Sequence, residues 1–323
     1  MKLLRIIPVL FAAAFLAGSS FAQPARAVAE SESLKFLRTT TLPDETRGLQ
    51  TVSTEYRPAN GAGPSVWLVG VAHLGTKEYY AAIQQRLDRQ SVVLYEGIGL
   101  QDLKAGPEAA KEHSAGIQGK LATGLGLLFQ LEAIDYRRAH FINSDLHVPE
   151  LREEVEKRSP NTAEPPADET FNNLLSALQG TGAAAGALGQ MIGFLTASPE
   201  MQETTKLMLV EVLGRAGEFL AAAKMQSAEI RQLFDVLLTQ RNEIVLRDLR
   251  AHLKRLKPEQ SIAVFYGAAH MDEIAKTLRS EMGYAPVKEE WDTAFSASPA
   301  KSGIQPAQLH LMLDLMRTHL QAP

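Results

Sequence analysis

The sequence predicts an α/β (or α+β) protein with a central, mostly parallel sheet built from two similar halves. A Gly-x-x-His motif follows an apolar, β-prone run twice, at residues 70–73 after the run 66–69 and at residues 267–270 after the run 262–266. Helical spacing of apolar residues follows each motif, over residues 76–89 and 272–282. Each half is therefore expected to be a strand, a turn and a helix, with a helical insertion or cap between the halves.

The first half predicts a β-α-β unit. An edge strand is expected around residues 50–56, followed by a strand at 66–69, a helix at 76–89 and a strand at 91–95. A crossover of this length favours parallel strands joined in the right-handed sense.

The middle of the chain, residues 105–257 approximately, is expected to be the helical insertion. A Leu-rich helix over 119–138 precedes a short buried strand at 139–142. Residues 170–199 carry no charge, but their centre is Gly/Ala-rich and Asn and Gln flank it, which favours a helical pair or cap over a membrane span. Two helices are expected within 201–257, the second over 227–254.

The second half predicts a strand at 262–266, a helix at 272–282 and a strand near 287–291. These elements complete a domain over residues 23–295. A loose hinge at 296–303 leads to an amphipathic tail helix at 309–320, within a C-terminal segment 296–323 that could pair two copies as a homo-oligomer.

The first 22 residues are expected to be a cleaved secretory signal. Lys2 and Arg5 precede the apolar stretch 6–18, and small residues precede a cleavage point after Ala22. This pattern predicts a periplasmic or secreted protein without membrane contact after cleavage; an uncleaved anchor is the alternative.

Composition excludes several classes of function. The chain has no cysteine, so it has no disulfides, thiolate ligands or cysteine nucleophile. Its formal net charge of −4 argues against nucleic acid as a partner. It lacks the His-Glu-x-x-His pattern of zincins and the Gly-x-Ser-x-Gly elbow of serine hydrolases.

His73 and His270 are the main candidates for chemistry. Both follow predicted strands, and the carboxyl ends of parallel strands in α/β proteins present ligands from a common edge. Two imidazoles from one edge could hold a metal ion, although a histidine at a strand end can also be purely structural.

Acidic and polar residues extend this candidate site. Glu96 ends an apolar strand and would be a metal ligand or general base beside His73 in the neighbouring strand, or else a salt-bridge partner. Asp145 ends the next strand and is a further candidate ligand. Arg241 and Asn242, expected mid-helix, could hold a substrate carbonyl or carboxylate, or could be solvated.

These motifs resemble the TraB/GumN family, which is related to the Tiki proteases, over residues 50–295 approximately. The resemblance implies a metal-dependent protease with His73, His270 and Glu96 at the metal centre, and with Arg241 and Asn242 at the Arg/Asn positions of the family. Many bacterial members have no established activity, so the resemblance supports the site more than the reaction.

The expected function is therefore an exported metal-dependent hydrolase that acts on a peptide or small carbonyl substrate. Zn²⁺, Mn²⁺ or Co²⁺ would suit the imidazole and carboxylate ligands and would activate water, with Arg241 or Asn242 steadying the oxyanion. Two alternatives stay open: a non-catalytic binder of peptide, haem or iron on the same fold, and an ester hydrolase resembling the erythromycin esterases.

Overall fold

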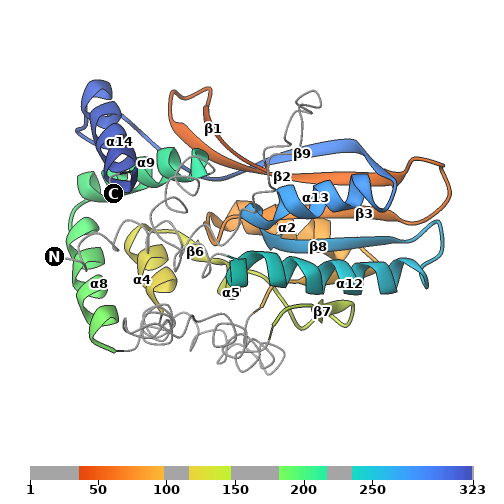
Figure 1. Ribbon diagram of the computed structural model, residues 1–323. Helices are drawn as coiled ribbons and strands as arrows, with labels where there is room; N and C mark the ends of the chain where they lie inside the picture. The colour runs from red at the N-terminus through yellow and green to blue at the C-terminus, as the bar shows by residue number, and fades with distance from the viewer. Residues whose placement is uncertain (1–35, 98–115, 147–181, 217–234, 322–323) are drawn as a thin grey trace.

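Four β-prone runs form the parallel part of a seven-stranded sheet, in the spatial order β3 (Ser65–Val71), β8 (Ser261–Gly267), β5 (Val92–Tyr95) and β7 (Phe141–Asn143). The computed structural model describes residues 36–97, 116–146, 182–216 and 235–321 (Figure 1). Each of these strands lies at or near its predicted position. Their apolar composition follows from burial, since helices cover both faces of a parallel sheet.

The rest of the sheet is antiparallel and centres on the long strand β2 (Arg47–Pro58). β9 (Tyr284–Ala297) pairs along the whole of β2, while the other edge of β2 is shared by β1 (Leu37–Thr41) and β3. The prediction of an edge strand at 50–56 is therefore wrong, because both edges of β2 are hydrogen-bonded. β9 also runs through Ala297, past the predicted start of the hinge.

Two helical layers enclose the parallel strands, so the chain has a mixed α/β architecture (Figure 1). Helix α2 (Lys77–Asp88) covers one face, and its N-cap Thr76 accepts a hydrogen bond from the main-chain N of Tyr79. Helices α12 (Arg241–Leu253) and α13 (Met271–Ser280) cover the other face. The predicted helices at 76–89 and 272–282 are thus confirmed.

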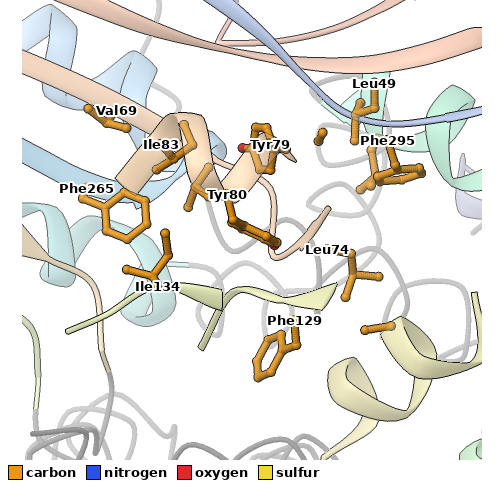
Figure 2. Packing of buried hydrophobic residues seen from close by; sticks show 14 of the residues in the cluster. Leu49, Val69, Leu74, Tyr79, Tyr80, Ile83, Phe129, Ile134, Phe265 and Phe295 are labelled. Carbon is orange, nitrogen blue, oxygen red and sulfur yellow. The ribbon is translucent and has the colours of Figure 1, made fainter. Parts of the chain in front are cut away.

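Alternating side chains of each strand supply the two cores. On the α2 side, Val69 and Phe265 pack with Tyr80 and Ile83, as Figure 2 shows. On the opposite side, neighbouring strand residues such as Val264 pack against α12 and α13. This packing holds the carboxyl ends of β3, β8 and β5 in a fixed relation.

The predicted helix over 119–138 is wrong, because the chain turns within it. The structure has three short elements there instead: α4 (Ile117–Gly124), β6 (Leu128–Phe129) and α5 (Gln130–Ala133). Gly126 adopts a positive φ of 67°, a conformation that ends a helix and that glycine tolerates best. β6 then pairs with β4 (Leu74–Gly75), directly after the first motif.

The described part of the uncharged segment is helical. α8 (Gly182–Leu195) contacts α4 and is followed by α9 (Pro199–Gly214), while residues 170–181 lie outside the described residues. None of the helices in the described ranges is long and apolar enough to cross a membrane.

The last predicted helices are found in part. A π-helical turn, Asp235–Gln240, leads into α12, and the earlier part of the predicted helix 227–254 lies outside the described residues.

The tail helix is confirmed as α14 (Pro306–Gln321). The predicted signal at 1–22 also falls outside the described ranges.

Candidate functional site

The carboxyl ends of four adjacent parallel strands bring the predicted residues to one edge of the sheet. His73 follows β3, Gly267 ends β8 and His270 follows it, Glu96 follows β5 and Asp145 follows β7. The shared edge for the two motifs is therefore confirmed. The prediction that Glu96 would lie in the strand next to His73 is wrong, because β8 inserts between β3 and β5.

Gly267 lies between the two histidines and the glutamate. A Cβ at this position would be 3.2 Å from Oε2 of Glu96, 3.4 Å from Nε2 of His73 and 3.8 Å from Cδ2 of His270. The φ and ψ of Gly267, −49° and 137°, are open to any L-residue. The backbone therefore does not require glycine here; what glycine provides is space among three polar side chains.

Glu96 is held in place by three contacts. Its Oε2 accepts a hydrogen bond from the main-chain N of Gly267 at 2.6 Å, and its Oε1 accepts one from Nη2 of Arg241 at 2.5 Å. Nε2 of His270 lies 3.6 Å from the same Oε1. The salt bridge that the sequence left open as an alternative is thus present.

The charge of Glu96 is set by these neighbours. Burial alone would raise the pKa of its carboxyl, but Arg241 and the imidazoles of His270 and His73 hold that pKa well below its usual range. The carboxylate is therefore ionised at neutral pH. Because it accepts a proton weakly, it is better suited to attract a cation than to act as a general base.

Asp145 pairs with Arg241. Both carboxylate oxygens accept from this guanidinium, at 2.8 Å from Nε and 2.7 Å from Nη2. The main-chain N of Gly97 and of Leu146 donates to the same carboxylate. The side chains of Asp145 and Arg241 are 0% and 3% exposed, so this is a buried, bidentate ion pair. A role for Asp145 as a metal ligand stays a prediction.

The buried cluster carries an excess of negative charge. Two carboxylates, Glu96 and Asp145, face one guanidinium, Arg241, which leaves a net charge of −1 when the imidazoles are neutral. An unbalanced charge in a buried site is costly unless a cation compensates it.

Asn242 fixes the ring of His270. Its Oδ1 lies 2.7 Å from Nδ1 of His270, and its Nδ2 donates to Oε2 of Glu273 at 2.6 Å. Both ends of the amide are therefore used within the protein. The suggested role of Asn242 at a substrate carbonyl stays a prediction, while its contacts are those of a residue that orients His270.

Gln130 plays the matching part for His73. Its Oε1 lies 2.9 Å from Nδ1 of His73, and its main-chain N donates to the carbonyl of the same residue at 2.9 Å. Its Nε2 donates to the Tyr136 hydroxyl. Burial lowers the pKa of His73, and the charge of Glu96 offsets this effect only in part. The lowered pKa favours the neutral imidazole.

Sequence reasoning missed Gln130 and Glu273. Glu273 follows His270 by three residues in the first turn of α13, a spacing that could have drawn attention to it. Gln130 carried no such signal, because it reaches His73 only through the pairing of β6 with β4.

Within the described residues, no three or more histidine, aspartate or glutamate side chains form a group ready to hold a metal ion. Comparisons with family models, curated proteins and solved structures found no match.

Proposed function

We propose that this chain is an exported, metal-dependent hydrolase of the TraB/GumN type that cleaves peptide or other carbonyl substrates. In this proposal the two strand–Gly-x-x-His–helix units are the two halves of the fold. Each half contributes one imidazole to a common site, and the chain acts in the periplasm or outside the cell after removal of residues 1–22.

The space beside Gly267 is the observation that carries the proposal. It is bordered by His73, His270 and Glu96, and the backbone conformation of Gly267 does not explain why a side chain is missing. A position that one carbon atom would fill, bordered by two imidazoles and a carboxylate, suits a small cation.

The donors fit a divalent ion of the Zn²⁺, Mn²⁺ or Co²⁺ kind. Nε2 of His270 is buried and has no hydrogen-bond partner among the described residues, so it is available as a ligand. His73 and the ionised Glu96 would complete the protein's share of the ligands, and the net negative charge of the cluster favours a cation. When bound, the metal would supply a Lewis acid and a water molecule of lowered pKa.

The chain's own residues prepare the site for this role. Arg241 donates to Oε1 of Glu96, the oxygen that lies 3.6 Å from Nε2 of His270, and forms an ion pair with Asp145. Gly267 fixes the second oxygen of Glu96 through its main-chain N. We therefore assign Arg241 to the orientation of Glu96 rather than to direct contact with an oxyanion.

Metal content measured on protein purified without chelator tests the site. Wild-type chain should carry one divalent ion, and the variants His73→Ala and His270→Ala should each lose it. His310→Ala is the matched control, because His310 is exposed on α14, an element that contributes no residue to the candidate site. Unchanged stoichiometry in both site variants would refute the metal centre.

A substrate screen then tests the reaction. Metal-loaded protein should hydrolyse members of a peptide library, and both site variants should be inactive. Hydrolysis of esters alone would point to the esterase alternative. Peptide capture without cleavage, or a visible absorption band on haem addition, would favour the non-catalytic binder.

A further inference from the structure

We propose that Gln130 and Asn242 are positioning residues that hold His73 and His270 as the Nδ1–H tautomer. Nε2 of His73 would then present its lone pair toward Gly267, and Nε2 of His270 would present its lone pair toward Oε1 of Glu96. This inference rests on the proposed function, because it names the residues that would prepare both metal ligands.

At His270 the assignment follows from Glu273. An ionised carboxylate accepts hydrogen bonds and cannot donate them. The Asn242 atom that lies 2.6 Å from Oε2 of Glu273 is therefore the amide nitrogen. The other end of that amide, 2.7 Å from Nδ1 of His270, is therefore the oxygen. An amide oxygen accepts, so Nδ1 must carry the hydrogen.

The consequence appears at the other ring nitrogen of His270. In the neutral ring Nε2 then has a lone pair, and it is buried without a hydrogen-bond partner among the described residues. Its neighbour at 3.6 Å is Oε1 of Glu96, a second acceptor. Two facing acceptors in a buried site need a proton or a metal ion between them.

Gln130 gives His73 the same arrangement from another element. Its main-chain N donates to the carbonyl of His73, which fixes the distance between the two residues, and Gln130 as a whole is 2% exposed. Oε1 of Gln130 faces Nδ1 of His73, while the amide nitrogen is occupied by the Tyr136 hydroxyl. The His73 imidazole thus directs Nε2 toward the Cβ position of Gly267, 3.4 Å away.

Partners of this kind matter because they orient a ligating ring and raise its basicity. Loss of one such partner typically weakens metal binding by about 10- to 100-fold. Removing either amide also removes the hydrogen bond that it donates, to Glu273 or to the Tyr136 hydroxyl, so stability has to be measured beside metal affinity.

¹⁵N NMR of histidine-labelled, metal-free protein at mildly alkaline pH tests the tautomers directly. The spectra of His73→Gln and His270→Gln assign the two rings. We expect the Nδ1–H pattern for both in wild type. Gln130→Met, which keeps the length but removes the acceptor, should lose that pattern at His73, whereas Gln130→Glu should keep it.

Zn²⁺ titration by calorimetry supplies the second readout. Gln130→Met and Asn242→Leu should bind Zn²⁺ about 10- to 100-fold more weakly than wild type, and Gln130→Glu should stay within tenfold of wild type. Circular dichroism checks that each variant folds; if Asn242→Leu does not, the two Gln130 variants decide.

Two results would overturn the inference. One is an Nε2–H tautomer at either ring in wild type; the other is a folded Gln130→Met with wild-type tautomer and Zn²⁺ affinity. Failure of the proposed function looks different: both rings would show Nδ1–H in a wild-type chain that binds no Zn²⁺, and the tautomer assignment would stand.

Discussion

The main-chain N–H of Gly267 donates to Oε2 of Glu96 at 2.6 Å and so ties the second Gly-x-x-His motif to the end of β5. This bond needs a close approach of the backbone of β8 to a carboxylate from the neighbouring strand. It also places the position that a Cβ of residue 267 would take between Glu96 and His73.

Gly267→Ala should therefore abolish metal binding while the protein stays folded. The added methyl would lie 3.2 Å from Oε2 of Glu96 and 3.4 Å from Nε2 of His73, and it would fill the space proposed for the ion. Because φ is compatible with alanine, we expect a change in unfolding free energy of only about 1 kcal/mol. Elemental analysis and chemical denaturation measure the two effects.

Gly193→Ala is the control for this substitution. Gly193 lies in α8, and a Cβ there would meet nothing within 4 Å. This variant should bind metal as wild type does. A Gly267→Ala protein with full metal content would show that the space beside Gly267 is not used by the ion.

The sequence was sufficient to predict this edge of the sheet but not the order of its strands. Apolar runs followed by Gly-x-x-His predict strands and their polarity, and polarity alone brings His73 and His270 to one edge. Whether β8 or β5 lies next to β3 depends on pairing between distant segments, which no local pattern encodes. For this reason the sequence predicts β5, with Glu96 at its end, as the neighbour of β3, whereas β8 takes that place.

The residues around the histidines were less predictable than the histidines themselves. The Leu content of 119–138 suits a helix, and only the turn at Gly126 together with the pairing of β6 and β4 brings Gln130 to His73. Such contacts arise from tertiary structure, which overrides helical propensity over short segments.

Arg241→Met should be strongly destabilising. It would leave the carboxylates of Glu96 and Asp145 buried without their cation, and breaking a buried ion pair in this way costs about 3–5 kcal/mol. Denaturant unfolding measures the loss. Adding Asp145→Asn in the same chain should recover part of it, because one of the two uncompensated charges is removed.

Arg247→Met is the matched control on the same helix. The Arg247 side chain is 69% exposed and pairs with Asp248 at 2.9 Å. Exposed pairs contribute about 0–1 kcal/mol, so this variant should unfold almost as wild type does. Equal losses for the two arginines would contradict the buried role assigned to Arg241.

Metal addition should stabilise the folded chain through the candidate site. An ion that binds only the folded state adds about 2.7 kcal/mol at a free concentration 100 times its dissociation constant. Differential scanning fluorimetry of chelator-treated protein should show Tm rising with Zn²⁺ or Mn²⁺, but not in His270→Ala. An equal rise in that variant would place the binding elsewhere.

Glu203 should make stability depend on pH, independently of the site. Its carboxylate accepts from Lys206 Nζ at 2.8 Å and from the main-chain N of Ser298 at 2.9 Å, which joins α9 to the residue after β9. Burial raises the pKa of Glu203, but these two partners outweigh burial and lower it from 4.5.

Because the pKa of Glu203 is lower in the folded state, its ionisation stabilises the fold. This contribution is complete above pH 4.5, the ordinary pKa of the group, and it is lost as the pH falls through the lowered pKa. Glu203→Gln should therefore cost about 1 kcal/mol at neutral pH. The difference from wild type should shrink below pH 4.5, the same ordinary value. Urea unfolding across pH measures this, with Glu259→Gln, at an exposed position, as control. A constant difference across this range would mean that Glu203 acts through its shape and hydrogen bonds, since its charge would then contribute nothing.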